Sequence, residues 1–138
     1  MTTPHGDAAN GSSRFDRWRP AVAFAAVVLV ASVVPIPEST SAASPGAGLG
    51  FTAAFHVVGY AILAALLARG TGRSLVGLVS AAAVATAFGF GIEVLQYPIP
   101  WRSFAWLDVL FNALGAVVGV TVVGVVVAIS RYVGESAG

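Results

Sequence analysis

Seven polar side chains in an otherwise apolar sequence are the ones that could do chemistry. They are His56, Tyr60, Glu93, Gln96, Arg102, Asp108 and Asn112. Only 9% of the residues are charged, and a charged group at the centre of a membrane helix costs about 2.5 to 3.5 kcal/mol on insertion scales. Glu93 and Asp108 are therefore expected to face other protein groups and not lipid.

These residue types allow three kinds of role. Arg102 is the natural partner of Glu93 or Asp108, because a guanidinium is always charged and offers a carboxylate two donors. His56 and Glu93 could act together as an acid and a base. The same groups could also only hold helices together, as polar contacts in membranes often do. Their spacing does not match a helical two-histidine metal motif, so no metal or other cofactor is expected.

Four apolar blocks must position these side chains. They cover residues 21–36, 51–68, 75–96 and 107–129. Each is close to the length of about 20 residues that crosses a hydrocarbon core about 30 Å thick. The blocks do not alternate polar with apolar residues, which favours helices over barrel strands. The 138 residues, 57% of them hydrophobic, thus predict one domain with an all-α fold, an integral membrane bundle of four transmembrane helices.

The arginines predict the orientation of this bundle. Six of the seven lie before the first block, between the second and third, or after the fourth: Arg14, Arg17, Arg19, Arg69, Arg73 and Arg131. By the positive-inside rule, both termini and the middle loop are cytoplasmic. The loops 37–50 and 98–103 then face outward, and all seven polar residues fall near the outer side. We expect a multi-pass protein of the cell membrane.

Two helix faces carry small and polar residues at helical spacing. On the third block these are Ala82, Thr86, Gly89, Glu93 and Gln96. On the fourth they are Asp108, Asn112, Gly115 and Gly119. The last two match the motif of two glycines four residues apart that lets membrane helices approach closely. Trp101, Phe104 and Trp106 indicate an aromatic belt at the interface.

The remaining sequence sets the domain boundaries. Residues 1–19 predict a disordered cytoplasmic tail with a basic juxtamembrane segment, 20–131 the membrane domain, and 132–138 a short cytoplasmic tail. A cleaved signal peptide is an alternative, made of the basic segment, the first block and the Ser/Ala-rich stretch through Ser44, and its removal would leave three helices. A net charge of +1 without a basic aromatic cluster argues against nucleic acid, and the lack of cysteine excludes thiol chemistry. Neither the oligomeric state nor the source organism is indicated.

The order of the polar residues resembles the VanZ-like family of small membrane proteins. The shared pattern is His56 with Tyr60, Glu93 with Gln96, the segment 102–104, and Asp108 with Asn112 and the two glycines. The founding member is linked to low-level resistance to the glycopeptide teicoplanin, which implies a role in the cell envelope. Many members have an Asp-Lys pair just before the histidine, where this chain has Thr52 and Ala53.

Three functions follow as hypotheses. The first is a polar pocket at the outer side that binds a lipid head group or a glycopeptide-like ligand through His56, Tyr60, Glu93, Gln96, Arg102, Asp108 and Asn112. The second is a membrane enzyme that acts on a lipid-linked or amphipathic substrate with His56 or Glu93 as acid or base. The third is a proton-coupled transporter, which the clustering of the polar groups on one side disfavours.

Overall fold

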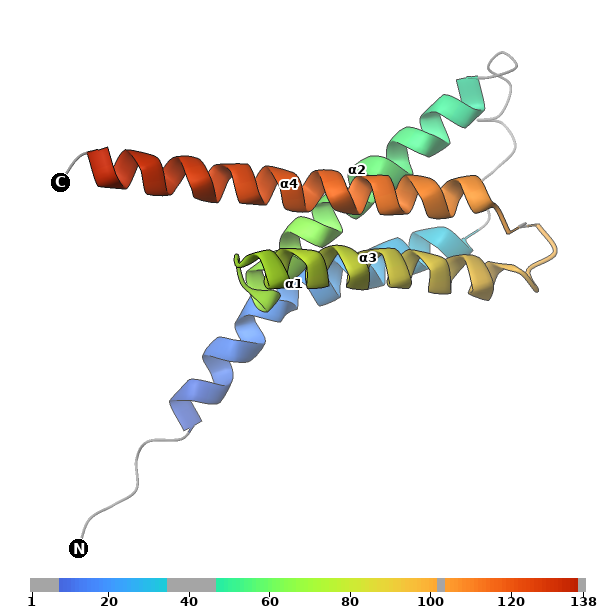
Figure 1. Cartoon of the computed structure of the whole chain (residues 1–138). Coiled ribbons are helices and arrows are strands. Elements are labelled where there is room, and N and C mark those ends of the chain that lie inside the picture. The colour runs from blue at the N-terminus through green and yellow to red at the C-terminus, as the bar shows by residue number, and fades with distance from the viewer. Residues whose placement is uncertain (1–7, 35–46, 102–103, 137–138) are drawn as a thin grey trace, which may run out of the picture.

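The chain folds into four helices, seen in a computed structural model that describes residues 8–34, 47–101 and 104–136. They are α1 (Ala8–Val33), α2 (Ala47–Thr71), α3 (Leu75–Gln96) and α4 (Trp106–Ser136). The part of the chain that is described contains no strand. The prediction of an all-helical fold is confirmed, and α3 has the predicted bounds (Figure 1).

Three of the four helices are long and apolar enough to cross a membrane. These are α2 over Thr52–Thr71, α3 and α4. α1 is not among them, because its apolar part begins only after the charged residues Asp16, Arg17 and Arg19. The predicted membrane-spanning bundle is therefore confirmed for three helices, while the fourth span stays a prediction.

The first and last helices extend beyond the predicted membrane domain. α1 begins at Ala8, inside the segment whose composition predicts a tail, and α4 continues to Ser136. α1 changes direction along its length (Figure 1). Pro20 lies inside it and lacks the amide that would continue the hydrogen-bond ladder, which is the usual cause of such a bend.

A short turn joins α2 to α3. Gly72 ends α2 with φ of 96°, a conformation that a residue without a β-carbon adopts without strain. Ser74 then caps α3, and its hydroxyl accepts the backbone N–H of Gly77 at 3.1 Å. This turn sets α3 antiparallel to α2 and places Arg69 and Arg73 close together at one end of the bundle.

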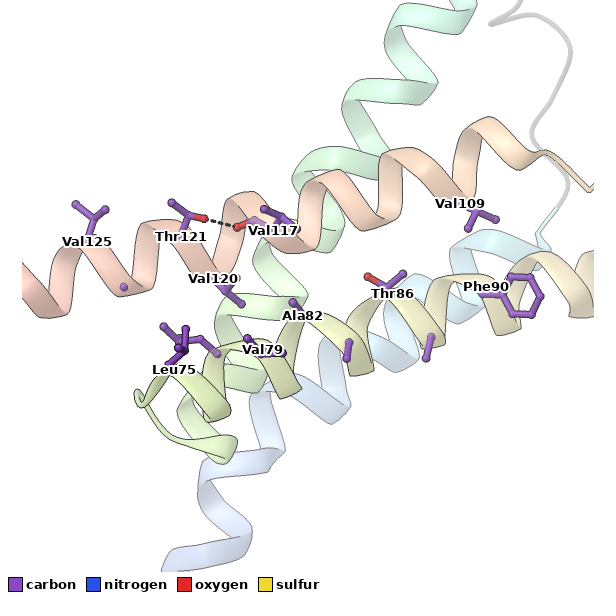
Figure 2. Close-up of a pocket in the computed structure, with 14 residues that line it drawn as sticks. Leu75, Val79, Ala82, Thr86, Phe90, Val109, Val117, Val120, Thr121 and Val125 are labelled. Atoms are coloured by element: carbon purple, nitrogen blue, oxygen red, sulfur yellow. Dashed lines mark hydrogen bonds between the residues drawn. The ribbon is translucent and has the colours of Figure 1, made fainter.

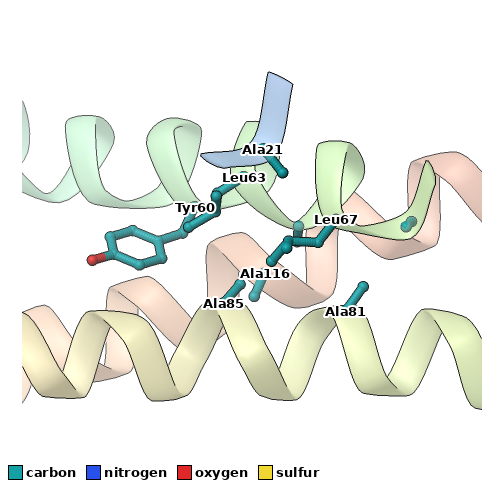
Figure 3. Close-up of a cluster of buried hydrophobic side chains, with 9 residues drawn as sticks. Ala21, Tyr60, Leu63, Leu67, Ala81, Ala85 and Ala116 are labelled. Carbon is teal, nitrogen blue, oxygen red and sulfur yellow. The ribbon is translucent and has the colours of Figure 1, made fainter. Parts of the chain in front are cut away.

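Small residues form most of the buried core. The alanines Ala64, Ala81, Ala85 and Ala116 are fully buried, and Leu63 and Leu67 of α2 point toward them (Figure 3). Ala21 brings α1 into the same cluster. Because lipid is as apolar as these side chains, the association depends on close van der Waals packing. α1 is therefore a packed part of the bundle.

The most extensive contact is between α2 and α4. A β-carbon at Gly115 would overlap the carbonyl of Val57, and one at Gly119 would overlap the carbonyl of Ala61. The two helices run in the same direction here, since Val57 precedes Ala61 as Gly115 precedes Gly119. The predicted close-packing motif is confirmed, with α2 as its partner.

The small and polar residues of α3 divide between a groove and a helix contact. Ala81 and Ala85 are buried, whereas Ala82 and Thr86 are only partly buried and line a groove on the other side. Further along, Gly89, Glu93 and Gln96 are buried as predicted. One residue is about 100° of rotation on a helix, and the packing partners decide which of two adjacent small residues faces inward.

Figure 1 shows that α1 ends, α2 begins, α3 ends and α4 begins on the same side of the bundle. We call this side the polar end, because His56, Glu93, Gln96, Asp108 and Asn112 lie there. We call the opposite side, with Arg69, Arg73 and Arg131, the arginine end.

Candidate functional site

His56 stands between two polar residues of α4. Its Nδ1 lies 2.8 Å from Oδ1 of Asn112, and its Nε2 lies 3.7 Å from Oδ2 of Asp108. With a proton on Nδ1, the ring donates to the Asn112 carbonyl and leaves Nε2 as an acceptor. With both nitrogens protonated, the ring forms an ion pair with Asp108. The predicted approach of His56, Asp108 and Asn112 is thus found.

These contacts belong to the α2–α4 crossing. Asn112 is one turn before Gly115, and His56 is next to Val57, so the hydrogen bond continues directly into the close backbone contact. The glycines allow the two helices to approach, and the approach brings the short Asn112 side chain within reach of the imidazole. Backbone packing and polar contact therefore depend on each other.

Asn112 and Tyr60 meet α3 at Gly89. A β-carbon at Gly89 would lie 2.6 Å from Nδ2 of Asn112 and 2.8 Å from Cε1 of Tyr60, so any larger residue would displace one of them. Tyr60 and Asn112 are 4% and 1% exposed. The Tyr60 ring is parallel to that of His56, with centroids 6.4 Å apart. Tyr60 supports the imidazole from the buried side.

Glu93 has a backbone partner that the sequence did not predict. Its Oε2 accepts the backbone N–H of Ala105 at 3.1 Å, and the side chain is 2% exposed. Ala105 directly precedes α4, where the first amides of the helix lack intrahelical acceptors and the helix dipole favours negative charge. Glu93 thus connects the end of α3 to the start of α4, and this hydrogen bond stabilises its buried carboxylate.

Gln96 holds α1 in a similar way. Its Nε2 donates to the carbonyl of Ser32 at 2.6 Å, in the last turn of α1. The final carbonyls of a helix have no partner within the helix, and a lone carbonyl in an apolar environment is costly. Gln96 satisfies one of them, which fixes the end of α1 against α3.

Aromatic side chains surround the connection between α3 and α4. Phe104 packs edge-on against Phe90 of α3, with centroids 6.2 Å apart, and against Trp106, at 4.9 Å. Trp101 and Trp106 are exposed. Such rings at the end of an apolar helix fit the predicted aromatic belt.

The structure divides the predicted site residues into two groups. Tyr60, Glu93, Gln96 and Asn112 are buried. The side chains of His56 and Asp108 keep 25% and 27% of their surface exposed and form the accessible edge of the cluster. Arg102 lies outside the described residues, so its predicted pairing with the carboxylates stays a prediction.

Sequence reasoning missed two partners, Ser32 and Ala105. Both take part through backbone atoms, and a backbone carbonyl or amide has no signature in the residue type. The only available signal was position, since each lies at a helix end that needs a polar partner. The assignment of Glu93 and Gln96 to ligand binding stays a prediction.

Fold and site together define a class: a small helical protein of the membrane whose helices are joined at one end by a polar cluster. The chain belongs to the VanZ/LLP1 family, whose model matches residues 36–127. This confirms the resemblance seen in the spacing of the polar residues. No curated protein and no solved structure matches the chain.

Proposed function

We propose that this protein is a multi-pass protein of the cell membrane with both termini in the cytoplasm and the polar end on the extracytoplasmic side. The arginines support this orientation. Arg69, Arg73 and Arg131 share one end of the bundle, as the positive-inside rule requires of a cytoplasmic face. The cluster around His56 then lies at the outer surface, where polar ligands of the cell envelope are found.

We further propose that the His56–Asp108 edge binds the polar part of an amphipathic ligand, either a lipid head group or a glycopeptide-like molecule. One observation carries this proposal: these two side chains are partly exposed, while their neighbours are buried. Asn112 and Tyr60 hold the imidazole in place, so little side-chain entropy is lost on binding. Asp108 would accept hydrogen bonds from amine or hydroxyl groups of the ligand.

The family supports a role in the cell envelope, and its founding member supports a link to antibiotic resistance. Arg102, in the connection between α3 and α4, would add recognition of phosphate or carboxylate groups. Glu93 and Gln96 serve in this scheme as supports that hold the start of α4 and the end of α1.

Calorimetric titration of the protein in phosphatidylcholine nanodiscs tests the proposal, with teicoplanin and glycerol phosphate as the two probes. Asp108→Asn should weaken the binding of at least one probe about tenfold or more, because a hydrogen bond to a charged group contributes about 1.5 to 3 kcal/mol. The matched control is Asp16→Asn, an exposed carboxylate beside Arg19 on α1. Unchanged affinity together with a lowered melting temperature would mean that the cluster is only structural.

An enzymatic function is the second candidate, and the fixed orientation of His56 favours it. An imidazole that donates from Nδ1 presents Nε2 as a base, which is the usual arrangement in acid–base catalysis. Glu93 is less suited to this role, since it is buried and already accepts the Ala105 amide. Mass spectrometry of a bacterial lipid extract incubated with the protein would test it. A lipid product made by the native chain but not by His56→Gln is the expected result.

Transport of a solute or proton has the least support. Toward the arginine end, the buried residues in the described part of the chain are apolar: Leu63, Ala64, Leu67, Ala68, Ala81, Ala85 and Ala116. A proton relay needs titratable groups at intervals across the membrane. The buried polar groups gather instead at the polar end.

A further inference from the structure

A groove runs along α3 and α4 on a face that neither α1 nor α2 covers (Figure 2). It extends from Leu75 and Val125 near the arginine end to Phe90 and Val109 near the polar end, and its volume is about 970 Å³. This is at the upper end of the range of about 300 to 1,000 Å³ for ligand pockets. The groove is separate from the His56–Asp108 edge, which lies between α2 and α4.

The lining of the groove is almost entirely apolar, and several of its residues are small. Ala82 and Ala83 of α3 and Gly124 of α4 leave room between the two helices. Of the two threonines in the lining, Thr121 donates its hydroxyl to the carbonyl of Val117 at 2.7 Å. A groove of this kind offers dispersion contacts to a flexible hydrocarbon and almost no polar recognition.

The length of the groove suits a single acyl chain. From Leu75 to Phe90, its α3 wall is about 22 Å long at a rise of 1.5 Å per residue. One leaflet accounts for half of a hydrocarbon core about 30 Å thick. An acyl chain that enters from the arginine end therefore finds apolar walls along its whole length.

Positive charge stands at the arginine end of the groove. Arg131 follows Gly124 by seven residues, which is two turns, so it continues the stripe of α4 that lines the groove. Leu78 of the antiparallel helix α3 packs against the Gly124 position, and Arg73 lies five residues before Leu78, in the turn that precedes α3. Arg73 and Arg131 therefore both lie on the arginine-end side of the contact between Leu78 and Gly124. Both are exposed, and neither forms an ion pair within the described residues.

We propose that this groove binds an anionic phospholipid of the leaflet at the arginine end, with one acyl chain between α3 and α4 and the phosphate between Arg73 and Arg131. Apolar walls and a basic entrance are the two features that such a lipid combines, and arginines near a membrane surface attract anionic lipids. This site goes beyond the polar cluster, because its phosphate position lies at the other end of the bundle and its groove is lined by other residues.

Native mass spectrometry tests the proposal, using the full chain released from nanodiscs that contain equal amounts of phosphatidylglycerol and phosphatidylcholine. The native chain should retain phosphatidylglycerol in preference to phosphatidylcholine. Arg131→Gln should lower that retention about fivefold, which is the contribution of one arginine near an anionic surface. Ala83→Phe should lower it to a similar extent by filling the groove, and Ala83 is exposed, so the substitution leaves the core intact.

Two matched controls decide the interpretation. Val84→Phe adds the same ring at the next residue, which is exposed but outside the groove. Arg17→Gln removes an exposed arginine of α1. Retention that falls equally in Arg17→Gln, or that is unaffected by Ala83→Phe, would show general charge attraction and overturn the proposal. A native dimer that Ala83→Phe converts to a monomer, with lipid retention unchanged, would overturn it in favour of a second copy of the chain as the occupant.

Discussion

Gly115 of α4 lies directly against the carbonyl of Val57 of α2, so closely that a β-carbon would overlap it. This contact brings the polar side chains on both helices together, because His56 precedes Val57 and Asn112 is one turn before Gly115. The position of the candidate site is thus set by a glycine that carries no chemistry of its own.

Replacing Gly115 should therefore destabilise the bundle more than replacing a glycine that faces open space. We expect Gly115→Ala to lower the free energy of unfolding by about 1 to 3 kcal/mol, the usual cost of overpacking. Gly91→Ala is the control, since nothing lies within 4 Å of a β-carbon there. Thermal unfolding in detergent measures both. Equal effects at the two positions would contradict the close contact.

The His56–Asn112 hydrogen bond should appear as an energetic coupling. In a double-mutant cycle with His56→Ala and Asn112→Ala, we expect a coupling energy of about 0.6 to 1.7 kcal/mol, as found for hydrogen bonds between membrane helices. Unfolding in a denaturing detergent supplies the four free energies. Strictly additive effects would mean that the contact at 2.8 Å contributes nothing to stability.

Glu93 should be replaceable by an uncharged acceptor but not by an apolar residue. Glu93→Gln keeps a carbonyl oxygen for the amide of Ala105, whereas Glu93→Leu leaves that amide without it, at a cost of about 1 to 3 kcal/mol. Hydrogen exchange of the peptide that contains Ala105 is the measurement. Faster exchange in the leucine variant and near-native exchange in the glutamine variant are expected. Protection that is unchanged in both variants would rule out the contact.

The lack of cysteine makes the proposed orientation directly testable. A single cysteine at Trp101, which is exposed at the polar end, should react with a membrane-impermeant maleimide in intact cells. A single cysteine at Arg73, exposed at the arginine end, should react only after the membrane is permeabilised. The reverse pattern would place the polar cluster on the cytoplasmic side.

Removing Gln96 should loosen α1 at its end. Gln96→Leu leaves the Ser32 carbonyl without its 2.6 Å donor, so hydrogen exchange in the last turn of α1 should become faster. Leu95→Ala is the neighbouring control, because Leu95 is half exposed. Exchange that increases equally in both variants would indicate a general loss of stability and no specific contact between Gln96 and the Ser32 carbonyl.

Sequence alone determined the helices and the end of the bundle where the polar residues gather. The apolar blocks are long, proline and glycine interrupt them, and the four helices alternate in direction, so His56, Glu93 and Asp108 had to meet at one end of the bundle. The pair Gly115 and Gly119 also predicted a close contact, because two glycines one turn apart let membrane helices approach closely.

Only the tertiary structure decided which group each polar residue contacts. Glu93 contacts the Ala105 amide and Gln96 contacts the Ser32 carbonyl, and backbone partners leave no trace in the sequence. The rotation of α3, which buries Ala85 and leaves Thr86 in the groove, depends on the shape of α2 and α4. The spacing of residues in the sequence fixes how deep each one lies along its helix. The helices packed against it decide whether its side chain is buried or exposed, and the partial exposure of His56 and Asp108 follows from that packing.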